Sequence, residues 1–340
     1  MKNLSLSDPR TSKIALWAGL LFSFAFTLLI WWAGERLNAI PLLPDQGALW
    51  YYWKLPDPTL ITHLSAWGLY ALHQISLWAL IYYAQTSVRK YASGLQPVNL
   101  WVLGLNAFFI LLHFIQSQVW YDGLAQDTPV WSSQGSVILM LCAILIMENR
   151  RRGMFFGKKA PLSERAVSFA RKYHGYLFAW AAVYTFWFHP MVNTLGHLIG
   201  FFYMFLLLLQ GSLFLTRIHV NKWWTLAQEV TVLFHGTLVA LTQGNGIWAM
   251  FAFGFGGIFV ITQMHGLNWS KLTRWLVGLA YVAATLIVYS ARGWGKLNEI
   301  IRIPLIEYLV AFAIAGLIAL GLWIVDRFRK PVVVEVTTQS

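Results

Sequence analysis

The chain has 340 residues, of which 58% are hydrophobic and only 11% are charged. A soluble globular domain carries about 25% charged residues, so this composition excludes an ordinary soluble protein and indicates a membrane protein. The single cysteine, Cys142, excludes an intrachain disulfide and a thiolate metal cluster.

Long apolar segments predict an all-α, polytopic integral membrane protein. A helix needs about 20 mostly apolar residues to cross a bilayer, and ten segments fit. They cover residues 14–34, 60–86, 98–121, 130–148, 167–189, 191–216, 223–243, 246–264, 273–291 and 304–325. We expect one membrane domain over 1–340. It has helices 1–4 in residues 1–149, a basic loop at 150–166, helices 5–10 in 167–326 and a short tail at 327–340.

The formal net charge of +12 would suit a nucleic-acid-binding protein, but the distribution of the charges argues against this partner. With ten spans and a cytoplasmic N-terminus, 20 of the 25 Lys and Arg residues lie on the cytoplasmic side and five lie outside. Cytoplasmic loops are enriched in Lys and Arg. The sequence therefore predicts that both termini are cytoplasmic, that the protein lies in the cell membrane, and that it binds no nucleic acid.

The longest basic stretch is ENRRRGMFFGKKAPLSER, residues 148–165, between the fourth and fifth spans. Basic side chains beside a membrane attract anionic lipid headgroups. We expect residues 150–159 to contact such headgroups, and the alternative is a docking site for a cytoplasmic partner.

Polar side chains inside a bilayer are costly and therefore informative. The second span carries His73, and the third carries Asn106, His113 and Gln116 on one helical face. His73 and His113 both fall near the middle of the membrane, and Asp122 follows the third span near the outer surface. We expect these two consecutive spans to place their polar faces together.

The stretch HPMVNTLGH, residues 189–197, adds two more histidines and an asparagine. Spacings of four and four place His189, Asn193 and His197 on one helical stripe, with the two histidines roughly 12 Å apart along the axis. Two ligands of one metal ion lie much closer together, so this stretch alone predicts no metal motif.

His197 is the histidine of this stretch that we expect to be functional, and His189 the one that tolerates change. The small residues Gly196 and Gly200 flank His197 and allow another helix to approach closely. We expect His197 to meet His113 or His235 across this contact.

Glu229, in the seventh span, is the carboxylate that sits deepest in a predicted helix. Such a side chain should face the interior and have a hydrogen-bond partner. A carboxylate can orient a histidine that acts as a general base, so we consider the pairs His113–Asp122 and His235–Glu229. Separations of nine and six residues do not place either pair side by side on one helix.

Together these residues predict a polar site in the outer half of the bilayer. The candidate catalytic residues are His113, His197, His235 and Glu229. The candidate cofactor ligands are His73, His113, His197 and His235, and a metal would use His73, His113 and His197. Polar support would come from Asn106, Gln116, Asn193 and Asp122.

The leading hypothesis for function is a membrane enzyme that acts on an isoprenoid, a quinone or an acyl lipid. Neutral imidazole is a ligand for transition metals and for haem b, so either is a possible cofactor. A dihaem arrangement would use His174 with His189 and His219 with His235. A transporter or channel with a histidine-lined path, and an assembly or structural factor, are the alternatives.

Overall fold

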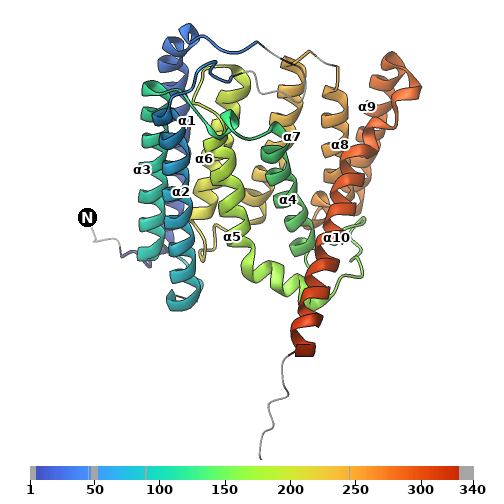
Figure 1. Cartoon of the computed structure of the whole chain (residues 1–340). Coiled ribbons are helices and arrows are strands. Elements are labelled where there is room, and N and C mark those ends of the chain that lie inside the picture. Colours follow the sequence, from blue (N-terminus) through green and yellow to red (C-terminus); the bar gives the residue numbers. More distant parts are fainter. Residues whose placement is uncertain (1–4, 45, 47–52, 89, 245, 329–340) are drawn as a thin grey trace, which may run out of the picture.

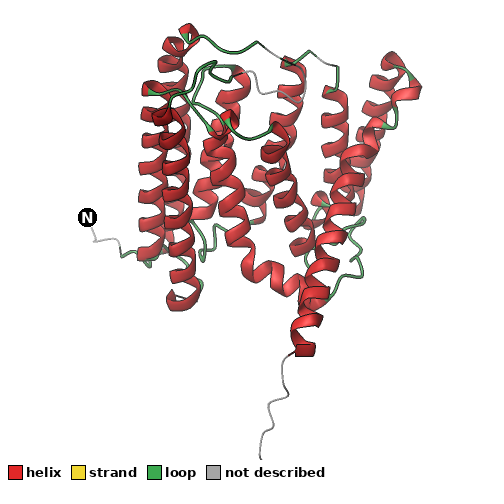
Figure 2. Ribbon diagram, viewed as in Figure 1, coloured by secondary structure: helices red, strands yellow, loops and turns green. Residues whose placement is uncertain are grey.

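The computed structural model describes residues 5–44, 46, 53–88, 90–244 and 246–328. Ten α-helices run alternately up and down through this part of the chain (Figure 1), and Figure 2 shows them joined by loops. They are α1 Pro9–Gly34, α2 Leu60–Tyr83, α3 Pro97–Val119, α4 Val130–Glu148, α5 Glu164–Phe188, α6 Leu195–Ser212, α7 Lys222–Thr242, α8 Trp248–Ile261, α9 Lys271–Arg292 and α10 Glu299–Phe328. Most of the predicted tail lies outside the described residues.

Eight of these helices are long and apolar enough to cross a membrane, namely all except α5 and α7. Their outward faces carry large exposed apolar side chains, such as Trp17 on α1, Ile287 on α9 and Leu317 on α10. An apolar exterior of this size requires a lipid environment. The architecture is therefore that of a polytopic helical membrane protein.

Local sequence signals set where the helices begin. Asp8 accepts a hydrogen bond from the backbone of Arg10 and precedes Pro9 at the first helical position of α1. Asn221 caps α7 in the same way. The bounds predicted for α4 agree with the structure, and those for the other helices differ by a few residues.

The predicted start of the sixth helix is wrong. Residues 190–194 form a non-helical connection, and α6 begins only after Thr194, which caps it. His189 is extended, with φ −112° and ψ 141°, because the residue before a proline is disfavoured in the helical region. The stripe of His189, Asn193 and His197 on one helix does not form.

A large cluster of buried aromatic side chains lies around the last turn of α5. Phe186, Trp187 and Phe188 are almost fully buried, and they pack against Phe109 of α3 and Phe201 of α6. On the other side of α5, α10 packs against α4, α5 and α8. Helices that precede the basic loop in the sequence therefore contact helices that follow it. Helix α5 packs against α2 and α6 as well as against α4 and α10.

Candidate functional site

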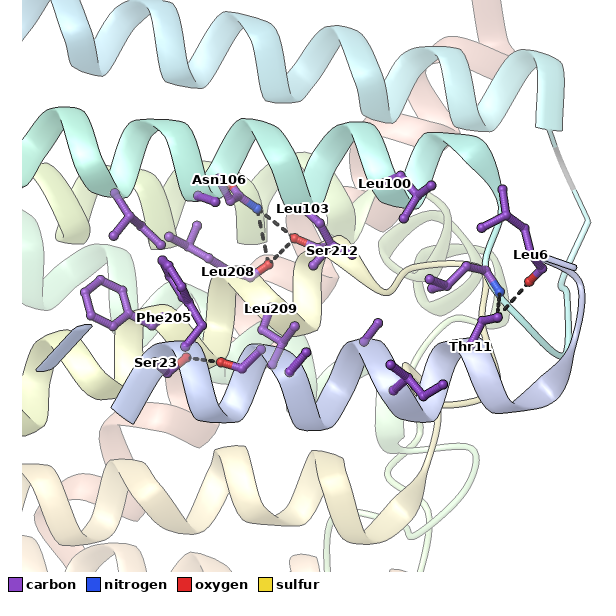
Figure 3. Close-up of a pocket in the computed structure, with 18 residues that line it drawn as sticks. Leu6, Thr11, Ser23, Leu100, Leu103, Asn106, Phe205, Leu208, Leu209 and Ser212 are labelled. Atoms are coloured by element: carbon purple, nitrogen blue, oxygen red, sulfur yellow. Dashed lines mark hydrogen bonds between the residues drawn. The ribbon is translucent and has the colours of Figure 1, made fainter. Parts of the chain in front are cut away.

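A groove of about 570 Å³ runs along α1, α3 and α6. Figure 3 shows its lining, with apolar side chains such as Leu103, Phe205 and Leu209 between the helices. Its few polar atoms come mainly from Thr11, Ser23, Asn106 and Ser212. A space of this size and polarity suits an apolar chain.

The deep polar wall of the groove is tied to His73 behind it. The Asn106 amide donates to Ser212 Oγ at 2.8 Å and to the Leu208 carbonyl at 3.3 Å (Figure 3). Asn106 Oδ1 therefore faces His73 Nε2, at 2.9 Å, as an acceptor. The Trp187 indole donates to His73 Nδ1 at 3.2 Å. Since an indole only donates, His73 is a neutral ring that carries its proton on Nε2.

His73 consequently does not fit the predicted role of a metal ligand. A metal binds the lone pair of a neutral imidazole, and the only lone pair of His73 accepts from Trp187. Among the described residues, no group of three or more His, Cys, Asp and Glu is placed to hold a metal ion. The structure does not bring His73, His113 and His197 together as a metal site.

His113 is fully buried at the junction of α3 with the end of α5. Its Nε2 lies 2.9 Å from the His189 carbonyl, and its Nδ1 lies 3.2 Å from Gln116 Oε1. The Gln116 amide donates towards Ser65 Oγ and the Asp122 carbonyl, which orients its oxygen towards the histidine. Both nitrogens of His113 thus face acceptors, so a second proton on the ring would have a partner. Full burial disfavours a charged ring at this place, and these two acceptors are the groups that would stabilise one.

The connection between α5 and α6 brings the other outer histidines together. The rings of His189 and His197 are 5.1 Å apart between centroids and nearly perpendicular. His197 Nδ1 lies 2.7 Å from the Thr194 hydroxyl, and its ring also packs against Trp53. The two rings therefore touch, and the expected contrast between a tolerant His189 and a functional His197 stays a prediction.

His235 reaches the same region from α7. Its Nε2 lies 3.3 Å from the Gly196 carbonyl, and a Cβ atom on Gly200 would lie 3.0 Å from that nitrogen. The expected close helix approach at Gly196 and Gly200 is confirmed, and α7 makes it. His113, His197 and His235 all lie within electrostatic range of His189, and His197 also lies within range of His235. We call these four residues the upper histidine group.

The two proposed histidine–carboxylate pairs do not form. His113 contacts Gln116 and the His189 backbone, and His235 contacts the Gly196 backbone. The remaining support residues have other partners: Asn193 donates to Glu35 Oε2 at 3.2 Å, and Asp122 Oδ1 accepts from the Gly123 amide at 2.8 Å.

Glu229 faces the interior and has a partner, as expected. It is 8% exposed, and Arg152 Nη1 donates to its two oxygens at 3.0 and 2.8 Å. The sequence reasoning missed two features of this site. Arg152 turns inward from the basic loop instead of facing lipid headgroups, and Glu307 of α10 is a second deep carboxylate, 4% exposed. Its position inside the predicted tenth span was the available signal.

The residues do not fit a haem in the groove, because no histidine lines it. The dihaem hypothesis places His174 and His189 on one helix and His219 and His235 on a second. In the structure His189 follows α5 in an extended conformation and His219 precedes α7, so neither pair lies on a single helix, although the His174 and His219 rings come within 6.2 Å between centroids.

Comparisons with known protein families, with curated proteins and with solved structures find no match to this chain.

Proposed function

We propose that this protein binds the apolar chain of a lipid-soluble molecule, an isoprenoid, a quinone or an acyl lipid, in the groove between α1, α3 and α6. The observation that carries the proposal is the groove itself, about 570 Å³ of almost wholly apolar lining. Its one deep polar wall, Asn106 with Ser212, is held in place by His73. An apolar chain would lie along the leucines and place a polar atom at this wall.

If the protein is an enzyme, the upper histidine group is the site at which we expect catalysis. His113 faces two acceptor oxygens, one of them the His189 carbonyl, and His197 and His235 lie near the His189 ring, which supports proton transfer by His113, His197 or His235. Glu229 is held by Arg152 and takes no part in this proposal. A transporter or channel with a histidine-lined path, and an assembly factor, remain the alternatives.

The proposed setting is a cell membrane crossed ten times, with both termini in the cytoplasm. α5 and α7 run the length of the bundle beside the eight apolar helices, and α1 begins at the same end at which α10 finishes (Figure 1). That end also carries the exposed Arg151, Lys158 and Lys159. We assign these side chains to anionic lipid headgroups.

A matched pair of leucine substitutions on α3 tests the groove. Leu103 lines it, whereas Leu111 is 47% exposed on the same helix and does not. Leu103→Trp should fill the groove and lower labelling by photoactivatable isoprenoid or acyl probes about tenfold, the effect of a loss of about 1.4 kcal/mol. Leu111→Trp should label like the parent.

The variant His197→Ala distinguishes binding of the apolar chain from conversion of the substrate, when it is labelled with the same probes. His197 lies outside the groove, so this variant should bind the probe normally, and a membrane enzyme would then accumulate its substrate unconverted. Equal labelling of Leu103→Trp and Leu111→Trp would contradict the proposal.

A further inference from the structure

Three charged side chains are buried together on the other side of α5 from the groove. Arg152 comes from the loop after α4, Glu229 from α7 and Glu307 from α10, and their residues are 4%, 8% and 4% exposed. All three line one small cavity with Gln263. None of the residues that line this cavity comes from α1, α3 or α6, the helices that form the groove.

Arg152 and Glu229 form a complete ion pair. The guanidinium Nη1 lies 3.0 and 2.8 Å from the two carboxylate oxygens, and both side chains are almost inaccessible. The positive charge of Arg152 is therefore neutralised by Glu229, and Arg152 cannot neutralise a second carboxylate as well.

Glu307 is the unbalanced member of the cluster. No residue in the described part of the chain donates a hydrogen bond to its carboxyl group, although its backbone carbonyl accepts from the Cys142 thiol at 3.4 Å. Its side chain borders a cavity of about 10 Å³, which is room for about one water molecule. Glu307 is thus a deeply buried carboxyl group that faces a space large enough for a single small partner.

The neighbouring groups do not supply a second positive charge. Arg151 is paired with Glu148 at the end of α4. The other titratable groups in electrostatic contact with Glu229 or Glu307 are Cys142 of α4, Tyr203 of α6 and Tyr308 of α10. With both carboxylates ionised, the cluster would carry a net charge of −1 in a site shielded from water, which is strongly unfavourable.

We propose that Glu307, Glu229 and Arg152 form a one-proton site, in which the proton resides on the Glu307 carboxyl group. Loss of this proton would produce a second carboxylate that competes with Glu229 for Arg152. The loop that carries Arg152 also touches α10, since the Tyr308 hydroxyl donates to the Met154 carbonyl and Phe155 stacks on Tyr308 at 4.8 Å. Protonation or deprotonation of Glu307 would therefore change the contacts that hold this loop, namely those of Arg152 with α7 and of Met154 and Phe155 with α10.

The infrared absorption of protonated carboxylic acids tests the site in the purified full-length protein. At neutral pH, Glu307→Gln should lose the carbonyl-stretch intensity of one protonated carboxyl group. Glu229→Gln should lose the same intensity, because Arg152 is then free to pair with an ionised Glu307. The control Glu164→Gln changes an exposed carboxylate that is paired with Arg150, and it should lose none.

Two results would overturn the proposal. One is unchanged carboxylic-acid intensity in both Glu307→Gln and Glu229→Gln, which would show that Glu307 is ionised in the parent. The other is loss of this intensity when sodium or potassium is added at constant pH, which would make the cavity a cation site. Glutamine matches the shape of a protonated glutamate, and Glu229→Gln gives an independent measurement if Glu307→Gln fails to fold.

Discussion

Asp122 is a buried carboxyl group in the loop that follows α3. It is 3% exposed, and its Oδ2 has no hydrogen-bond partner among the described residues. Burial raises the pKa of Asp122 from 3.8 to about 6, against the smaller opposing effect of the Gly123 amide. At pH 7 the folded protein therefore holds an ionised carboxylate that the unfolded chain would solvate better.

Asp122 should make the protein more stable as the pH falls towards 5. The folded state takes up a proton near pH 6, whereas the unfolded chain does so only near 3.8. The cost of burying the ionised group is thus fully present above pH 6 and decreases gradually as the pH falls from 6 to 3.8. Its upper limit is about 3 kcal/mol. Thermal unfolding in detergent between pH 7.5 and 5 measures this effect.

Asp122→Asn should flatten that pH dependence and raise the unfolding midpoint at pH 7.5. Glu164→Gln is the control, because Glu164 is an exposed carboxylate that pairs with Arg150. The control should retain the stabilisation at acid pH. A parent protein whose midpoint falls steadily from pH 7.5 to 5 would show that Asp122 is already solvated.

Residue-level reasoning from the sequence located polar groups but not their partners. His73, Asn106 and His113 were singled out because polar side chains in apolar helices are rare. The group that fixes the tautomer of His73 is Trp187, 114 residues away in sequence. Partners on distant helices depend on packing, and the spacing within one helix carries no information about them.

At the scale of elements, the helices themselves were the most predictable feature. Ten apolar segments correspond to α1 to α10, because helix length and apolar composition are local properties. The connection at residues 189–194 was not predictable from spacing. The extended conformation before Pro190 brings His189 back towards His197, so two rings expected far apart lie 5.1 Å apart.

The loop after α3 is held tightly against the end of α5. A Cβ atom on Gly123 would lie 2.5 Å from the Phe188 carbonyl oxygen, a rigid backbone atom. Gly123→Ala should therefore force the loop and α5 apart and destabilise the protein by about 1–3 kcal/mol. The backbone of Gly123 is extended, so the cost is steric.

Gly135→Ala is the control for this change. Gly135 lies within α4 with open space around its Cα, where alanine favours the helix by about 0.5–1 kcal/mol. The thermal midpoint of Gly135→Ala should equal or exceed that of the parent, and the midpoint of Gly123→Ala should fall by several degrees. Equal midpoints for the two variants would mean that the loop adjusts freely.

At the scale of the whole molecule, two polar sites lie in different parts of the bundle, and the sequence did not distinguish them. The groove uses α1, α3 and α6, and the upper histidine group adds the end of α5 and His235 of α7. The cluster of Arg152, Glu229 and Glu307 lies among α4, α7, α8 and α10. Helix α10 reaches α4 across 150 residues of sequence, and no periodicity in one chain predicts such a pairing.

Ten spans predict which loops face the cytoplasm, and α5 and α7 are the helices that decide the number. If α5 crosses the membrane, the loop before α7 is cytoplasmic, and if α5 does not cross, that loop is external. Whether α7 crosses decides the side of the connection between α9 and α10. Val220 in that loop is 58% exposed, and the native Cys142 is buried, so an introduced cysteine should dominate labelling.

We expect Val220→Cys and Lys158→Cys to react with a membrane-impermeant maleimide only after permeabilisation. Lys296→Cys should react in intact cells, because Lys296 belongs to the connection between α9 and α10, which lies at the opposite end of the bundle (Figure 1). Labelling of Val220→Cys in intact cells, with Lys158→Cys still protected, would show that α5 does not cross, because α5 and α6 are the helices between these positions and α6 is an apolar span. Protection of both Val220→Cys and Lys296→Cys in intact cells would show that α7 does not cross, because α7 lies with the apolar α8 and α9 between those positions.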